Sequence, residues 1–249
     1  QVWTGLLLRV ENEAQLAAVI GHEIGHYLQR HSVARLRDIK EKAAASQVLS
    51  LFGLAGALGA FAVLASAYAY GRDHEREADR VGAYLMHRAG FSVSEAAKVW
   101  SNLLDEARAR EGREPSETSP LFATHPVPPE RRDALGKLAE QLQGGTAGRE
   151  RYAEHTRHLV DEWLQDEVKR GQYAESLVLL NRQVSNGDSP QLAQYYRGEV
   201  HRLRGEPGDL DQAWQDYQAA TGGPRPAAQA FRGIGLLARQ KGLKDDAKA

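Results

Sequence analysis

A long uncharged segment limits how this chain can fold. Residues 43–71 contain no charged residue and no histidine, although charged residues make up 26% of the 249-residue chain. A window of about 19 such residues is typical of a membrane span. The alternatives are a buried helix, a helical hairpin broken near the glycines, and a segment that covers a cleft and touches a membrane surface. The residues on either side of the segment decide between these arrangements.

A His-Glu-x-x-His motif lies before this segment, in a helix predicted over residues 12–31. In a helix, a spacing of four places His22 and His26 on one face, one turn apart, so that both imidazoles can bind one metal ion. Glu23 is rotated by about 100° from His22 and can take a proton from water without being a ligand. A chance match is the alternative, because the chain contains nine histidines.

A charged helix is predicted directly after the segment, over residues 72–89. Glu75 and Asp79 are four residues apart and therefore lie on one face of it. Glu75 can supply a third metal ligand, and Asp79 can accept the free ring N–H of a ligating histidine. We interpret the neighbouring Arg76 and Glu77 as part of a solvated face with ion pairs.

These ligands argue against a membrane crossing between them. A single span between His26 and Glu75 would place the ligands of one ion on opposite sides of a hydrocarbon core about 30 Å thick. The segment is also too short for two spans of about 20 residues each. We therefore favour a helix within residues 43–71 that packs beside the active site, and peripheral membrane contact of this segment remains an alternative.

The first residues of the chain have the composition of a strand. Residues 2–10 are rich in β-branched, aromatic and leucine side chains, which predicts a short edge strand. Such an edge can hold an extended peptide by main-chain pairing. Because the chain opens at Gln1 inside this strand, we expect a processed or truncated product. The predicted fold is mainly α, with a small edge sheet.

Composition excludes several classes of function. The chain has 32 Lys and Arg against 33 Asp and Glu, so no basic surface favours nucleic acid as a partner. The absence of cysteine excludes disulfides, thiolate zinc sites and cysteine nucleophiles, so any metal must be bound by His, Asp or Glu. The glycines within residues 53–59 lack the Lys and Ser/Thr of a phosphate-binding loop.

The chain divides into two predicted domains. The glycine-rich residues 144–149 predict a linker between residues 1–143 and residues 150–249. We expect both domains to be incomplete, the first at its N-terminus and the second at its C-terminus. In the second domain, a glycine followed five residues later by a small residue recurs at intervals of 37 and 34 residues, at Gly171, Gly208 and Gly242. This period resembles that of tetratricopeptide repeats, with an unrelated helical bundle as the alternative.

Three segments together resemble the HtpX/BepA-type zinc peptidases, which are gluzincins. They are NEAQLAAVIGHEIGHYLQRHS, EREADRVGAYLMHRAGFS and THPVPPERR, within residues 1–143. Repeats after a metallopeptidase domain make the periplasmic BepA-like branch the nearest resemblance. The resemblance implies one zinc ion per chain, held by His22, His26 and Glu75. It also implies that Glu23 is the general base and that Asp79 is a carboxylate that hydrogen-bonds to a ligating histidine.

The third segment contains His125, to which the resemblance gives a further role. It implies that this loop histidine approaches zinc and closes the site in a resting state, because a fourth protein ligand leaves no open position. Alternatively, His125 donates a hydrogen bond to the oxyanion of a tetrahedral intermediate. It can also be a structural histidine in a proline-rich turn.

The resemblance implies a zinc endopeptidase that cleaves extended segments of unfolded or misassembled proteins in the periplasm. Its role would be quality control and outer-membrane protein assembly, with the repeats contacting clients or an assembly machine. One alternative is a chaperone or scaffold that acts through the repeats while the peptidase site is closed. Another is a metal-stabilised scaffold without turnover, although such a scaffold has no use for Glu23.

Overall fold

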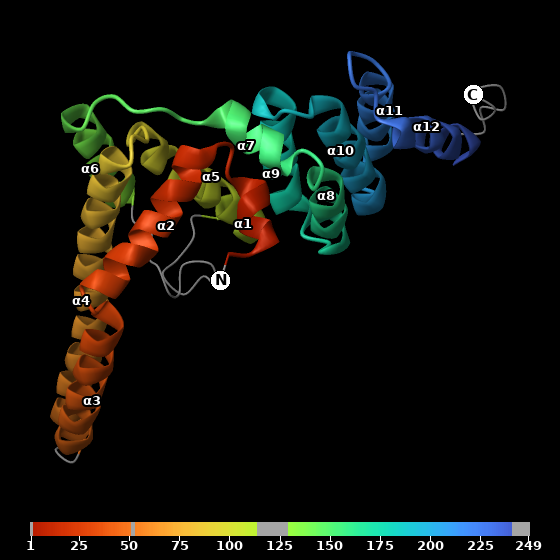
Figure 1. Ribbon diagram of the computed structural model, residues 1–249. Helices are drawn as coiled ribbons and strands as arrows, with labels where there is room; N and C mark the ends of the chain where they lie inside the picture. Colours follow the sequence, from red (N-terminus) through yellow and green to blue (C-terminus); the bar gives the residue numbers. More distant parts are fainter. Residues whose placement is uncertain (1, 51–52, 114–128, 241–249) are drawn as a thin grey trace. The chain divides into compact units, whose positions relative to one another are not determined.

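The computed structural model describes residues 2–50, 53–113 and 129–240, and these residues are almost entirely helical (Figure 1). No strand occurs in these three ranges, where one isolated bridge joins Phe91 and Thr146. The helices, in chain order, are α1 (Thr4–Arg9), α2 (Glu13–Leu28), α3 (His31–Ser50), α4 (Gly53–Arg88), α5 (Ser94–Glu111), α6 (Pro129–Gln141), α7 (Arg149–Thr156), α8 (Val160–Lys169), α9 (Tyr173–Asn186), α10 (Pro190–Arg204), α11 (Asp209–Ala220) and α12 (Ala228–Gln240).

The helices pack into two compact units. The motif unit comprises Ala14–Trp100 and Ser116–Ala147, and it contains the His-Glu-x-x-His motif. The repeat unit comprises Gln1–Glu13, Ser101–Pro115 and Gly148–Ala249. Packing therefore groups the first residues of the chain with the C-terminal helices, whereas the predicted domain boundary follows the linker in the sequence.

The start of the chain is helical, so the predicted edge strand over residues 2–10 and the small edge sheet are wrong. Tertiary contacts of α1 override the β propensity of these side chains. Leu8 is buried in a core cluster of the repeat unit that also contains Leu164 and Leu180. Arg9 Nε lies 2.6 Å from a carboxylate oxygen of Glu106, and the Arg9 guanidinium also pairs with two carboxylates of α8 and α9.

The uncharged segment forms part of a helical hairpin. Helices α3 and α4 run antiparallel and pack against each other (Figure 1). The structure therefore has the hairpin arrangement in place of the single packed helix that we favoured. Within the described ranges, no helix combines the length and the apolarity that a bilayer crossing requires. Membrane contact of this segment stays a prediction, because the side chains of 50–58, 60–62 and 64–70 lie outside the described residues.

The C-terminal helices pack in the order of the sequence. Helix α10 contacts α9 and α11, and α11 contacts α12. The buried ring of Tyr217 on α11 lies against Gly198 of α10 and Gly233 of α12, where a Cβ atom would come within 2.7 Å and 2.9 Å of the ring. These two glycines are 35 residues apart and have equivalent roles, which is the pattern expected of a helical repeat.

In the motif unit, small residues let α2 and α4 cross closely. A Cβ atom on Gly25 would lie 2.8 Å from the carbonyl oxygen of Ala78, and one on Gly82 would lie 2.8 Å from the backbone nitrogen of His22. Both distances are shorter than a carbon atom can adopt without displacing the other helix. The absence of these side chains therefore brings the histidine motif of α2 against the acidic residues of α4.

The Gly25→Ala variant is expected to lower the free energy of unfolding by about 1–3 kcal/mol, because the added methyl group overpacks the crossing. Urea denaturation followed by circular dichroism measures this change. Gly136→Ala in α6 is the matched control, since a Cβ atom there meets no described atom within 4 Å. The control should be neutral or stabilising by up to about 1 kcal/mol. Equal stability of Gly25→Ala and the wild type would contradict the close crossing.

Candidate metal centre

Three predicted site residues converge in the motif unit. His22 and His26 come from α2 and Glu75 comes from α4, and their ligand atoms all lie within 4.8 Å of one another. The Nε2 atoms of the two histidines are 3.1 Å apart. One Glu75 oxygen lies 3.3 Å from His22 Nε2 and the other lies 3.1 Å from His26 Nε2. The helix crossing thus brings together residues that α3 and the first part of α4 separate in the sequence.

The chemistry and spacing of these donors fit a zinc ion. Two imidazole nitrogens and one carboxylate oxygen are the protein ligands of many catalytic zinc sites, which keep a further position for water or substrate. Donors about 2.0–2.2 Å from one tetrahedral ion are about 3.3 Å from each other. The two imidazole nitrogens, 3.1 Å apart, therefore have about the separation of two ligands of one ion, and each lies 3.1–3.3 Å from one of the two Glu75 oxygens.

Glu23 lies on α2 beside His22 but outside this converging group. Its side chain is exposed, whereas His22 and Glu75 are buried and His26 is partly buried. An exposed carboxylate next to a buried ligand can exchange protons with solvent while staying close to the site. This placement is compatible with the predicted role of a base that is not a ligand.

Asp79 contacts the second ring nitrogen of His22. His22 Nδ1 lies 2.9 Å from Asp79 Oδ1, so an Nδ1–H donor leaves the lone pair of Nε2 directed toward Glu75 and His26. Burial lowers the pKa of His22, but the hydrogen bonds to Asp79 and Glu75 outweigh it and raise the pKa overall. Burial alone would raise the pKa of Asp79, but the hydrogen bonds from Arg131 and His22 lower it.

Arg131 of α6 is a site residue to which the sequence analysis gave no role. Its side chain is only 1% exposed. Nη1 lies 2.9 Å from Glu75 Oε2, and Nε lies 2.6 Å from Asp79 Oδ2. The guanidinium also lies over the Trp100 ring, 4.8 Å from its centroid. Arg131 therefore neutralises two buried carboxylates, and no local spacing in the sequence could reveal a partner 52 residues away.

His31 and Glu77 also lie beside the ligands, although the sequence analysis assigned Glu77 to a solvated face and gave His31 no role. His31 is the first residue of α3 and is buried. Its Nδ1 lies 3.0 Å from His26 Nδ1, and its Nε2 lies 3.3 Å from Glu77 Oε2. The ring of His31 stacks on His74, with 4.1 Å between the ring centroids. No helical spacing indicated this contact, because α2 ends at Leu28 and His31 begins the next helix.

His125 lies outside the described residues, within 114–128. Its three possible roles, which are closing the zinc site, binding an oxyanion and stabilising a turn, therefore stay predictions.

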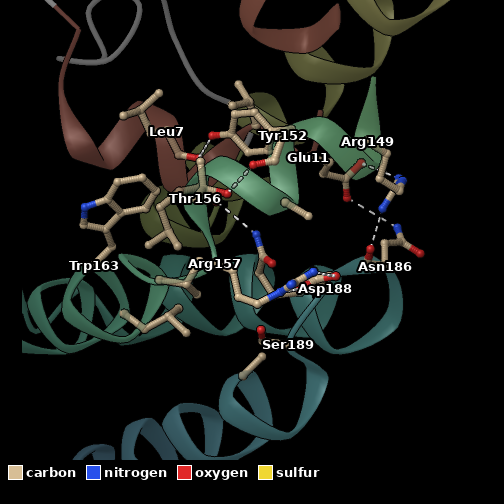
Figure 2. A pocket seen from close by; sticks show the side chains of 18 of the residues that line it. Leu7, Glu11, Arg149, Tyr152, Thr156, Arg157, Trp163, Asn186, Asp188 and Ser189 are labelled. Atoms are coloured by element: carbon tan, nitrogen blue, oxygen red, sulfur yellow. Dashed lines mark hydrogen bonds and ion pairs between the residues drawn. The ribbon is translucent and has the colours of Figure 1, made fainter. Parts of the chain in front are cut away.

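A cavity of about 220 Å³ lies in the repeat unit and contains none of the predicted site residues (Figure 2). Apolar side chains such as Leu7, Val160 and Trp163 form much of its lining. The Tyr152 hydroxyl donates to the carbonyl of Leu7 at 2.6 Å, and the Thr156 hydroxyl donates to the carbonyl of Tyr152 at 2.8 Å. These hydroxyl groups are therefore already hydrogen-bonded within the protein.

Comparisons with known proteins find several proteases among the relatives of this chain. The beta-barrel assembly-enhancing protease of Escherichia coli (strain K12) is 30% identical over 145 residues, which cover 53% of this chain and 29% of the relative. The protein of the same name from Yersinia pestis is 28% identical over 153 residues, covering 56% of this chain and 30% of the relative.

A eukaryotic relative shows the same similarity over a shorter range. The mitochondrial metalloendopeptidase OMA1 of Arabidopsis thaliana is 32% identical over 102 residues, covering 41% of this chain and 21% of the relative. The aligned part thus spans less than a third of the length of these relatives. No solved structure matches the chain significantly.

The profile of peptidase family M48 matches residues 1–139, which is more than half of the chain. The matched range includes the converging histidines of α2, Glu75 of α4 and Arg131 of α6. This protein therefore belongs to peptidase family M48.

Proposed function

We propose that this protein is a zinc-dependent endopeptidase that cleaves unfolded or misassembled proteins. The observation that carries the proposal is the convergence of His22, His26 and Glu75, whose ligand atoms all lie within 4.8 Å of one another. The exposed carboxylate of Glu23 beside this group supports a catalytic use of the metal, because a structural site needs no base.

His22, His26 and Glu75 would hold the zinc ion. When bound, zinc supplies Lewis acidity, which polarises a peptide carbonyl and lowers the pKa of water. Glu23 accepts a proton from water and returns it to the amine that leaves. Asp79 and Arg131 keep the His22 ring and the Glu75 carboxylate in the orientation that ligation requires.

Proteins with extended segments are the proposed substrates, because a peptide bond must be presented to the site without its surrounding fold. The names of the relatives support a role in β-barrel assembly, and with it a periplasmic location and contact with outer-membrane assembly machinery. We assign this contact to the helices of the repeat unit, which we interpret as tetratricopeptide repeats. Closure of the resting site by His125 belongs to the same proposal.

Metal analysis tests the proposal. Protein purified without chelators should contain one zinc ion per chain, and His22→Ala should lose it together with peptidase activity, since two donors bind zinc much more weakly than three. His155→Ala is the matched control, because His155 is exposed on α7. The control should keep both zinc and activity. Wild-type protein without zinc, or His22→Ala with a full complement, would exclude the proposed site.

A further inference from the structure

The second ring nitrogen of each ligating histidine has a different kind of partner. His22 Nδ1 lies 2.9 Å from a carboxylate oxygen of Asp79. His26 Nδ1 instead lies 3.0 Å from another imidazole nitrogen, His31 Nδ1. An imidazole can either donate or accept at this position, so the contact alone does not determine which nitrogen of His26 carries the proton.

The proton must nevertheless be on one particular nitrogen for His26 to bind a metal. His26 Nε2 lies within 3.1 Å of both His22 Nε2 and Glu75 Oε1, so Nε2 is the atom that faces the ion. A ligating Nε2 needs a free lone pair, which places the proton of the neutral ring on Nδ1. His26 must therefore donate from Nδ1, and His31 Nδ1 must accept.

The contact with Glu77 favours the tautomer of His31 that can accept a hydrogen bond at Nδ1. His31 Nε2 lies 3.3 Å from Glu77 Oε2, and a carboxylate at this position accepts a hydrogen bond. A neutral His31 with its proton on Nε2 satisfies Glu77 and leaves a lone pair on Nδ1 for His26. The opposite tautomer of His31 would donate to His26 Nδ1 and force the proton of His26 onto the metal-binding nitrogen.

The surroundings hold His31 in the position that this arrangement requires. Its side chain is 5% exposed, and its ring stacks on His74 with an angle of 15° between the planes. The partners of His31, which is on α3, come from two other helices, because His26 lies on α2 and both His74 and Glu77 lie on α4. Burial and stacking restrict rotation of the ring, so its two nitrogens face His26 and Glu77 at the same time.

We propose that His31 is a positioning residue that keeps His26 in its zinc-binding tautomer, with Glu77 as the final hydrogen-bond acceptor. The inference rests on the proposed zinc site and adds His31 to the residues that position the zinc ligands. Glu77 thereby acts as a hydrogen-bond acceptor, whereas its sequence context suggested a solvated face with ion pairs. The side chain of Glu77 is 39% exposed.

Two substitutions of His31 separate the hydrogen bond from the packing of the ring. His31→Phe keeps a flat ring beside His74 but removes the acceptor, so the zinc dissociation constant should rise about 10–100-fold, as for other residues behind metal ligands. His31→Asn loses the ring, but its side-chain oxygen can occupy the place of Nδ1. Its dissociation constant should stay within about threefold of the wild type.

Zinc titration against a competing chelator measures these constants, with His158→Phe as the control because His158 is exposed. The inference is overturned if His31→Phe binds zinc as tightly as the wild type. It is equally overturned if His31→Asn is weakened as much as His31→Phe, since the ring alone would then matter. A wild-type protein that binds no zinc would instead contradict the proposed function.

Nuclear magnetic resonance tests the same inference without a variant. Long-range proton–nitrogen spectra of the zinc-loaded wild-type protein should show His26 protonated at Nδ1 and His31 protonated at Nε2. A proton on Nδ1 of His31 would overturn the inference, whatever the activity of the enzyme.

Discussion

The Glu23→Gln variant is expected to lower the rate of peptide hydrolysis by about 10²–10⁴-fold while it keeps one zinc ion per chain. Glutamine has nearly the same shape as glutamate but cannot accept the proton of the attacking water. The zinc complement should not change, because Glu23 lies outside the group formed by His22, His26 and Glu75. Measuring kcat on unfolded casein, together with metal analysis of the same sample, checks both parts.

Glu41→Gln provides a control for the loss of one exposed carboxylate. Glu41 lies on α3, and its side chain is exposed. This variant should hydrolyse casein at the wild-type rate. If Glu23→Gln also retained the wild-type rate, another group would have to be the base. If the Glu23→Gln variant lost its zinc, Glu23 would contribute to metal binding rather than to proton transfer.

For Arg131→Met, we expect the free energy of unfolding of the metal-free protein to fall by about 3–5 kcal/mol. Methionine can fill part of the space of the arginine stem, but it leaves the buried carboxylates of Glu75 and Asp79 without their shared cation. Removing one partner of a buried ion pair is costly because the remaining charge is neither solvated nor compensated. Urea denaturation in the presence of a chelator measures the difference.

The effect of Arg131→Met should depend on pH in a defined direction. In the folded wild-type protein burial alone would raise the pKa of Asp79, but the combined contacts with Arg131 and His22 lower it. A lowered folded-state pKa stabilises the protein above the unfolded-state pKa, and this contribution is lost as the pH falls through the folded-state value. The stability difference between wild type and variant should therefore narrow as the pH falls through the acidic range.

Arg132→Met is the matched control for this experiment. Arg132 is the next residue of α6, and its side chain is 45% exposed and paired with Asp133. Loss of this exposed ion pair should change the free energy of unfolding by no more than about 0.5 kcal/mol. Equal destabilisation by the two variants would show that the buried contacts of Arg131 do not stabilise the fold.

Helical periodicity accounts for the part of the site that could be predicted. The spacing of four within α2 puts His22 and His26 on one face, and the same spacing within α4 puts Glu75 and Asp79 on one face. Residues one turn apart in a helix are neighbours whatever the rest of the fold does. The candidate ligands could therefore be named from two short segments, and the structure places their atoms together.

Long-range contacts account for most of what could not be predicted. The helical conformation of Thr4–Arg9 depends on burial of Leu8 and on carboxylates more than 90 residues away, and these contacts overcome the local β propensity. The role of Arg131 likewise depends on partners 52 and 56 residues earlier in the chain. Local patterns carry no information about such pairs.

The sequence by itself determined the residues with metal-binding chemistry, their helical faces and the family resemblance, because these depend on side-chain type and on spacing within one helix. Only the tertiary structure decided that α2 and α4 cross closely at Gly25 and Gly82. It also decided that Arg131 contacts Glu75 and that His31 contacts His26. The physical reason is that a metal site needs donors from separate helices within a few ångströms. Packing, and not spacing along the chain, sets that distance.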